Sequence, residues 1–191
     1  MKVAFECFLF SLNILNTLSE HSGMCPKIVT KNDWGARAAA TVDYSIIPLK
    51  YVIVHHTLTP SCKCESACAD LLKNLQNFHM DIQGFHDIGY NFLVGGDGNV
   101  YEGAGWHRVG AHTKHYNTKA IGLAFVGNFT SKLPNKKQLH ATGRFLKCAI
   151  ERGEIDRRYK LLGARTVSAT QSPGLALFRE IQRWEHFSRV P

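Results

Sequence analysis

A run of apolar and β-branched residues, Tyr51–His55, ends at two adjacent histidines, His55 and His56. A continuous apolar run of this length, without polar alternation, is typical of a strand buried on both faces of a sheet. Functional side chains often lie at the ends of such strands, so the histidines mark a first candidate site. Because adjacent strand residues point to opposite faces, the two histidines are not expected to bind one metal ion together.

The rest of the sequence alternates between helical and strand periodicity. The strand signals after 51–55 are a hairpin of 90–94 and 100–102 around a glycine-rich turn, a strand over 121–126 and a short strand at 159–162. The helix signals are a segment from about 66 to 80, a helix opened by Pro134 and Asn135, and a last helix behind Ser172 and Pro173, read as a cap and first turn. This order predicts one domain of the α/β (α+β) class, with a central mixed sheet flanked by about three helices.

The first 23 residues differ in composition from the remainder. Lys2 precedes an apolar run over 3–18, and polar residues follow to position 23, which is typical of a secretory signal peptide. The run is too short and too often interrupted for a membrane span, so we expect a secreted, extracellular domain of residues 24–191. Removing Lys2, Glu6 and Glu20 from 23 basic and 15 acidic residues leaves 22 and 13, a net charge of +9 with neutral histidines.

This positive charge favours encounters with anionic polymers. No run of basic residues interleaved with aromatics is present, and secretion argues against a nucleic-acid partner. Neither nucleic acid nor a membrane is therefore an expected partner.

Five of the six cysteines lie beyond the predicted signal peptide, in an oxidising compartment. Cys62 and Cys68 could close a short loop, and Cys25 and Cys148 could tie the N-terminus to a late helix, which leaves Cys64 unpaired. The alternative is a zinc site of Cys62, Cys64 and Cys68, but the spacing lacks the paired two-residue gaps of such sites. The sequence favours disulfides.

The segment 103–120 has neither helical nor strand periodicity, yet it is rich in aromatic, histidine and amide side chains. Long irregular segments of this kind usually bind a ligand, and these side chains suit sugars and peptides. Trp106 is open to two interpretations, a ligand contact or part of the core. For a metal, His79, His86, His112 and His115 offer nitrogens, but none has a spacing to His55 that predicts a site.

Successive blocks of the chain resemble the peptidoglycan-recognition proteins, relatives of phage-type N-acetylmuramoyl-L-alanine amidases. The blocks are Tyr51–Thr57, Asp87–Phe92, Gly96–Gly103, Gly105–Trp106, Gly110–Thr113, Gly122–Gly127 and Ser168–Gly174. They keep their order and cover nearly all of residues 25–188. The resemblance implies an amidase-like fold.

In amidase members of that family, zinc is held by two histidines and a cysteine, whose positions here are His55, Ala164 and Ser172. An alanine has no donor atom, and a serine hydroxyl is a poor ligand at neutral pH. Tyr90 and Thr170 match positions that assist the amidase reaction, but neither generates a nucleophile. The resemblance therefore implies a degenerate zinc site, no metal cofactor and no amidase activity.

The resemblance retains the binding positions better. The peptidoglycan contacts that it implies are His55, His56, Thr57, His79, Gln83, Gly84, Phe85, Tyr90, Ala104, His112 and Asn117. Family members that prefer meso-diaminopimelic acid have Gly-Trp where this chain has Gly84 and Phe85, and arginine in place of Ala104. Because Ala104 cannot pair with the extra carboxylate, lysine-type peptidoglycan is favoured, although Gly84 keeps half of the other pattern.

The C-terminal block Thr170–Leu175 and the aromatic helix behind it are most similar to short insect members of the family. That likeness implies a circulating haemolymph sensor upstream of Toll signalling, with a glucan-binding-type protein and a serine protease as partners. Asn128, Phe129 and Thr130 form a glycosylation sequon.

Two hydrolase alternatives stay open at this point. The first is a zinc amidase with His79 or His112 as a substitute ligand. The second is a peptidase of the stem peptide, with Ser172 or Thr170 as nucleophile and His55 as base. Against the second, Ser172 is expected to cap a helix, and no acidic residue is evident to orient the histidine.

Overall fold

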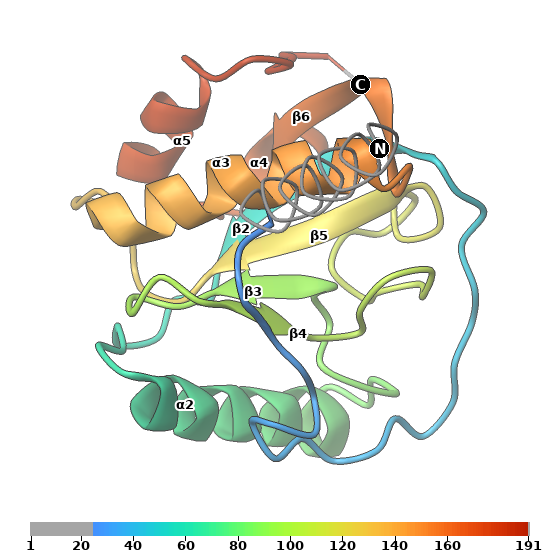
Figure 1. Cartoon of the computed structure of the whole chain (residues 1–191), viewed down its shortest axis with the longest axis vertical. Helices are drawn as coiled ribbons and strands as arrows, with labels where there is room; N and C mark the ends of the chain where they lie inside the picture. The colour runs from blue at the N-terminus through green and yellow to red at the C-terminus, as the bar shows by residue number, and fades with distance from the viewer. Residues whose placement is uncertain (1–24, 191) are drawn as a thin grey trace, which may run out of the picture.

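A six-stranded mixed sheet, with strand order β1-β4-β3-β5-β2-β6, forms the centre of the computed structural model (Figure 1). The structure describes residues 25–190, so the predicted signal peptide lies outside the described residues. The strands are β1 (Ile28–Val29), β2 (Leu49–His56), β3 (Phe92–Val94), β4 (Val100–Glu102), β5 (Ala120–Phe125) and β6 (Ile155–Gly163). The helical elements are α2 (Glu65–Asn77), the π-helical η1 (Phe78–Ile82), α3 (Lys136–Glu151), α4 (Ala164–Val167) and α5 (Leu175–Ile181).

The strand predicted from Tyr51–His55 is the central part of β2. It pairs in parallel with β5 on one side and with β6 on the other. Residues 52–56 of β2 and all of β5 are buried, as expected for parallel strands covered on both faces. The predicted hairpin is also present, because β3 and β4 pair antiparallel across the glycine-rich turn.

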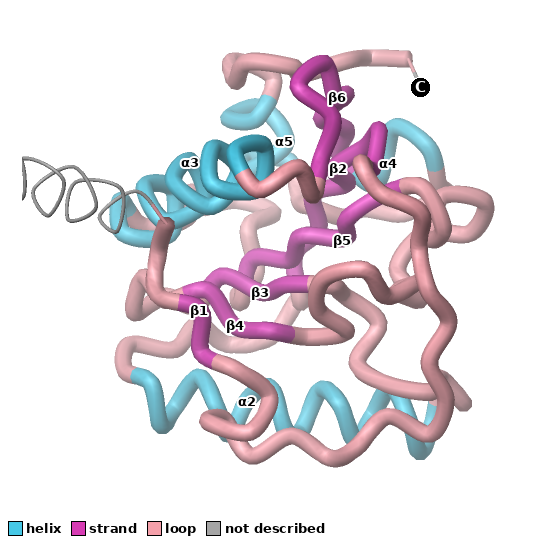
Figure 2. Tube along the Cα trace, turned by 45° about the vertical axis from the view of Figure 1, so that its right-hand side comes forward, coloured by secondary structure: helices cyan, strands magenta, loops and turns pink. Residues whose placement is uncertain are grey.

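Helices cover both faces of the sheet, with α3 and α5 on one side and α2 on the other (Figures 1 and 2). Phe145 of α3 and Ile181 of α5 pack in one hydrophobic cluster, and Leu72 of α2 packs in a second. Asn135 caps α3 through a capping box with Gln138, which confirms the predicted helix start. The predicted mixed α/β fold is thereby confirmed.

The predicted cap at Ser172 is wrong. Helix α5 begins at Leu175, and its N-cap is Gly174, whose φ of 88° is a conformation that glycine adopts without steric cost. The Ser172 hydroxyl instead accepts a hydrogen bond from the backbone N–H of His56 at 3.1 Å. Strand β1 and helix α4 are too short to produce a periodic signal, and neither was predicted.

Both expected disulfides are formed, Cys25 to Cys148 and Cys62 to Cys68. Cys64 is left as an exposed free thiol. The alternative zinc site of three cysteines is therefore wrong, because two of its sulfurs are bonded to each other. Within residues 25–190, no helix is both long and apolar enough to cross a membrane.

Candidate binding groove

A groove of about 400 Å³ opens at the C-terminal end of β2, where the paired histidines lie. Strand β2 supplies the floor, and the loops that follow β2 and α4 form two of the walls. The residues that line it are His55, His56, Thr57, Leu58, Tyr90, His112, Ser168, Thr170, Gln171 and Ser172. Five of the predicted peptidoglycan contacts, from three separate segments of the sequence, thus come together.

A single hydroxyl lies between His55 and His112 in the groove. Thr113 Oγ1 lies 3.1 Å from His55 Nε2 and 3.0 Å from His112 Nδ1. A hydroxyl both donates and accepts, so it can bridge two neutral imidazoles. Burial lowers the pKa of His55 well below its usual range, and burial lowers the pKa of His112 to about 4. Both rings are therefore uncharged at neutral pH.

An aromatic row extends the groove from β2 towards η1. The His55 ring lies 5.2 Å from the Tyr90 ring, Tyr90 lies 5.7 Å from His79, and His79 lies 5.4 Å from Phe85. Burial raises the pKa of Tyr90 to about 12, so its phenol keeps its proton and remains a hydrogen-bond donor. The row therefore contains three rings with polar atoms, His55, Tyr90 and His79, followed by the apolar ring of Phe85.

Of the three chemotype positions, Phe85 lies at the end of this row, whereas Ala104 lies elsewhere. Gln83 and Gly84 are exposed directly after η1. The backbone N–H of Gly89 donates to His79 Nδ1 at 3.0 Å, which orients the imidazole. Ala104 is only 4% exposed and lines a separate hollow of about 90 Å³, together with Arg108.

Asn117 has a structural role in addition to its predicted place beside the ligand. Its side-chain oxygen accepts from the backbone N–H groups of His112 at 3.1 Å and Thr113 at 2.7 Å. This interaction holds the turn that presents His112 to the groove. The side chain of Asn91 anchors the same segment to β5 by accepting from the backbone N–H of Gly122 at 2.9 Å.

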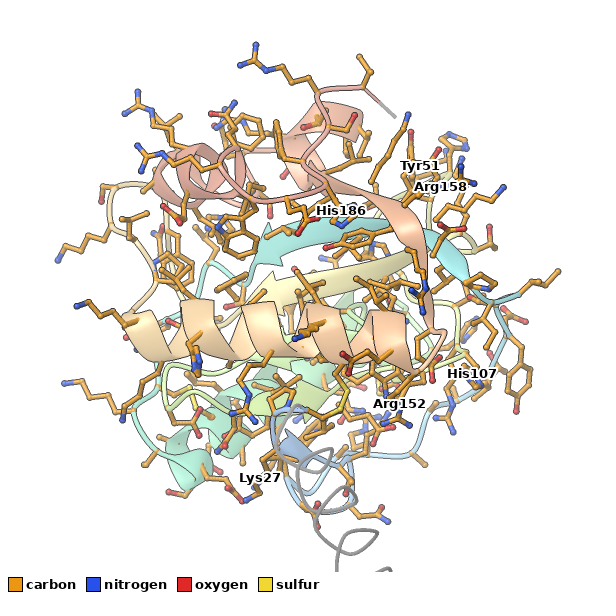
Figure 3. The ribbon with its side chains drawn as sticks, turned by 45° about the horizontal axis from the view of Figure 1, so that its top comes forward. Lys27, Tyr51, His107, Arg152, Arg158 and His186 are labelled. Carbon is orange, nitrogen blue, oxygen red and sulfur yellow. A yellow bond between two sulfur atoms is a disulfide. The ribbon has the colours of Figure 1, made fainter. Side chains whose placement is uncertain are left out.

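Trp106 belongs to the core, which decides between its two interpretations. Its ring stacks on that of Phe145 in α3, with the ring centroids 5.1 Å apart, and its centroid lies 4.2 Å from that of the Phe92 ring. The guanidinium of Arg152 lies over its outer face at 5.7 Å, and Figure 3 shows Arg152 at the end of α3. The long segment therefore packs at its start and contributes His112 to the groove further on.

The three positions that the resemblance assigns to zinc ligands lie together. Val54 pairs with Gly163 across β2 and β6, and the residues that follow this pair are His55 in β2 and Ala164, the first residue of α4. Ser172 Oγ lies 3.5 Å from His55 Nδ1. The set offers one imidazole, one methyl group and one hydroxyl, whereas a catalytic zinc needs three good donors. These side chains do not fit zinc.

Neighbouring histidines do not complete the set. Across residues 25–190, no three His, Cys, Asp or Glu side chains lie together in a way that could hold a metal ion. His112 Nδ1 lies 3.0 Å from the Thr113 hydroxyl, and His79 Nδ1 accepts from the Gly89 N–H, so each ring has only its Nε2 atom left for a metal. The substitute-ligand hypothesis therefore has no support in the described geometry.

Comparison with known proteins decides the family. Residues 46–175 match the family model described as N-acetylmuramoyl-L-alanine amidase. "Peptidoglycan-recognition protein 2" of Holotrichia diomphalia is 52% identical over 97% of this chain and 100% of that protein. The chain belongs to the peptidoglycan-recognition protein family. Another member, "Peptidoglycan-recognition protein SA" of Drosophila melanogaster, is 44% identical over 87% of this chain and 82% of that protein.

Solved structures of family members have the same fold. The structure of Drosophila peptidoglycan-recognition protein SA superposes with a TM-score of 0.86, at 44% identity over 87% of this chain and 96% of that chain. A second structure, at a TM-score of 0.84 and 43% identity over 85% of this chain and 98% of that chain, is titled as tracheal cytotoxin bound to the ectodomain complex of members LCa and LCx.

Three residues that line the groove, and Thr113 next to its histidines, were missed by the sequence reasoning. Ser168 and Gln171 stand in the last family block, so the block was a signal that they lie near the site. Thr113 also stands in a block, but nothing in its type indicates that it bridges two histidines. Leu58 follows the histidine block, and its place in the groove had no sequence signal.

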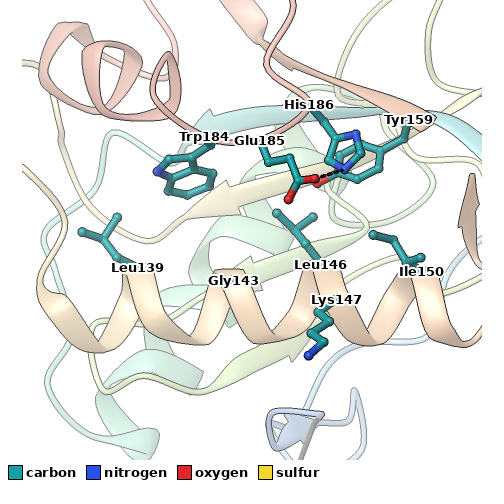
Figure 4. Close-up of a pocket in the computed structure, with 9 residues that line it drawn as sticks. All are labelled: Leu139, Gly143, Leu146, Lys147, Ile150, Tyr159, Trp184, Glu185 and His186. Atoms are coloured by element: carbon teal, nitrogen blue, oxygen red, sulfur yellow. Dashed lines mark ion pairs between the residues drawn. The ribbon is translucent and has the colours of Figure 1, made fainter. Parts of the chain in front are cut away.

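A larger hollow, of about 580 Å³, lies away from this groove, between α3 and residues 184–186 (Figure 4). Its lining is mostly apolar, with Leu139, Leu146 and Trp184 around the exposed Gly143. None of the family's binding positions lines it. The groove at the end of β2 is therefore the candidate site.

Proposed function

We propose that this protein binds bacterial peptidoglycan outside the cell and does not hydrolyse it. The observation that carries the proposal is the contrast within one groove. The polar rings around His55 converge, while Ala164 and Ser172 take the places of two metal ligands. Membership of the family supports the ligand class, and the side chains support the absence of hydrolysis.

The groove suits an uncharged ligand rich in amides and hydroxyls. The lowered pKa values of His55 and His112 keep the imidazoles neutral, and Tyr90 keeps its proton, so binding does not require a charge to be desolvated. Each net hydrogen bond contributes roughly 0.5–1.5 kcal/mol, so several together give micromolar binding or better. A polymer with many repeats increases this affinity through avidity.

Hydrolysis requires an activated water, which the amidase reaction obtains from zinc. We expect the wild-type protein to pull down insoluble peptidoglycan without releasing soluble muropeptides, even after dialysis against zinc. The double variant A164H/S172C should bind one zinc ion, measured by metal analysis, whereas A164H alone should bind it poorly. Zinc-dependent release by the wild-type protein would contradict the proposal.

The preference for lysine-type peptidoglycan rests on Ala104. A bidentate arginine contact is among the stronger polar interactions, and alanine cannot make it. Arg108 lines the same small hollow, so the comparison of the two polymers includes R108A as well as the wild-type protein. Stronger binding to lysine-type polymer by both proteins supports the preference. If wild type instead binds diaminopimelate-type polymer more strongly and R108A does not, Arg108 supplies the guanidinium that Ala104 lacks.

Secretion and signalling complete the proposal. Two disulfides fit an oxidising compartment, and the N-terminal sequence of protein secreted from insect cells should begin near residue 24. Likeness to member SA of Drosophila supports a role upstream of Toll, with a glucan-binding-type protein and a serine protease. The test is reconstitution, in which protease activation should require peptidoglycan, this protein and the glucan-binding partner together.

A stem-peptide peptidase is the second candidate, because Ser172 Oγ lies 3.5 Å from a ring nitrogen of His55. The lowered pKa of His55 makes it a weak base, and the serine hydroxyl already accepts from the His56 N–H. S172A decides between the candidates. If new amino groups appear when muropeptides are incubated with wild-type protein and not with S172A, the protein is a peptidase.

A further inference from the structure

Leu58 combines an unfavourable backbone conformation with an exposed apolar side chain. Its φ is 57°, in the left-handed region that costs residues with a Cβ atom. Among residues 25–190, the other non-glycine residues with positive φ are three histidines, a residue type that tolerates this region better. The Leu58 side chain is 64% exposed, so core packing does not compensate for the strain.

The backbone around Leu58 is held firmly in place. Its N–H donates to the Gly127 carbonyl at 3.0 Å, and the Thr57 N–H donates to the Phe125 carbonyl at 3.0 Å. The Thr57 hydroxyl accepts from the Gly127 N–H at 2.9 Å and lies 2.7 Å from the Thr59 hydroxyl. Strained residues that are held in this way are concentrated at ligand sites.

The position of Leu58 indicates what it contacts. Of the described residues that line the groove, it is the one with an aliphatic side chain, among histidines, hydroxyls, Tyr90 and Gln171. It therefore supplies an apolar surface to the groove that His55 and Ser172 also line. A ligand that fits this groove presents a small apolar group at that surface.

Resting on the proposed function, we infer that Leu58 recognises the side chain of the first stem residue of peptidoglycan and favours L-alanine over glycine. The amide cleaved by the amidase relatives joins the muramoyl lactyl group to this L-alanine, and His55, Ala164 and Ser172 mark its position. The alanyl methyl group is next to that amide. The lactyl methyl group is common to all muramyl peptides, so a difference between ligands at this apolar surface falls on the first amino acid.

The test is a double-mutant cycle between protein and ligand. The two probes are lysine-type disaccharide pentapeptides that differ only in L-alanine or glycine at the first stem position. The proteins are wild type, L58A, and L133A as the matched control, because Leu133 is also exposed (54%) but does not line the groove. Calorimetry measures each affinity.

Wild type and L133A should bind the alanyl probe about fourfold more tightly, the effect of burying one methyl group. L58A should bind the two probes equally. A fourfold preference that survives in L58A, or equal binding of the probes by wild type, overturns the inference. Failure of wild type to bind either probe overturns the proposed function, and the inference with it.

L58G gives an independent readout of the strain. Glycine adopts a φ of 57° freely, so L58G should raise the unfolding midpoint while it abolishes the alanyl preference. A purely structural leucine would instead give a lower midpoint and unchanged preference. That result would overturn the inference even if L58A failed to fold.

Discussion

Neutral, buried histidines should make the stability of this protein fall steeply in mild acid. The His112 pKa is about 4 in the folded protein and about 6.5 in an unfolded chain. Between these values the unfolded state binds a proton that the folded state does not, so the free energy of unfolding decreases as the pH falls. Each pH unit costs up to ~1.4 kcal/mol, and the interval corresponds to about 3 kcal/mol for His112 alone.

Urea denaturation of wild type and H112N between pH 7 and pH 4 measures this effect. From pH 7 to pH 4 the free energy of unfolding of wild type should fall by about 3 kcal/mol more than that of H112N. The carboxylates do not affect this difference, because they contribute equally to both proteins. Y90F is the matched control, since it changes the same groove without removing a group that titrates in this range. Parallel stability curves for wild type and H112N would refute the reasoning.

Further substitutions test the scaffold by urea denaturation. G143A should stabilise the protein by about 1 kcal/mol, because Gly143 is helical and an added Cβ meets no atom within 4 Å. G153A should destabilise it, because Gly153 is equally open but has a φ of 73°. The C25A/C148A pair should cost about 4–5 kcal/mol, more than loss of the short second disulfide, because it opens a loop with a sequence separation of 123. N91L should cost about 3 kcal/mol, since it leaves the Gly105 and Arg108 carbonyls and the Gly122 N–H of β5 without their side-chain partner. Equal losses for the two disulfides, or a neutral N91L, would contradict these assignments.

Elements with a strong periodic signal were predictable from the sequence. The apolar run around Val54 can be buried on both faces only as a central strand, and the cap at Asn135 marks the start of α3. The start of α5 was predicted too early, because Ser172 followed by proline resembles a helix cap. The N-cap in the structure is Gly174. Local sequence does not show that the serine hydroxyl has a more distant partner in His56.

Groove residues that belong to a family motif could be predicted one by one from the sequence. Residues whose role depends on tertiary contacts could not. Thr113 bridges two histidines because β2 and the loop before β5 lie side by side, and no spacing along the chain encodes that contact. Leu58 owes its conformation to the Gly127 carbonyl, a partner well separated in sequence. Such roles depend on the assembled sheet.

The proposed absence of zinc is compatible with an ordered groove, because hydrogen bonds join β2, α4 and the loop before α5. Ser172 Oγ accepts from the His56 N–H at 3.1 Å, and the Ser172 carbonyl accepts from the Arg165 N–H at 2.9 Å. The Ser172 N–H donates to the Thr170 hydroxyl at 3.1 Å. The first two bonds connect β2 and α4 to the loop before α5, and the third lies within that loop, so this part of the groove is held together by the protein's own hydrogen bonds. A serine at this position is therefore compatible with recognition, although it is a poor zinc ligand.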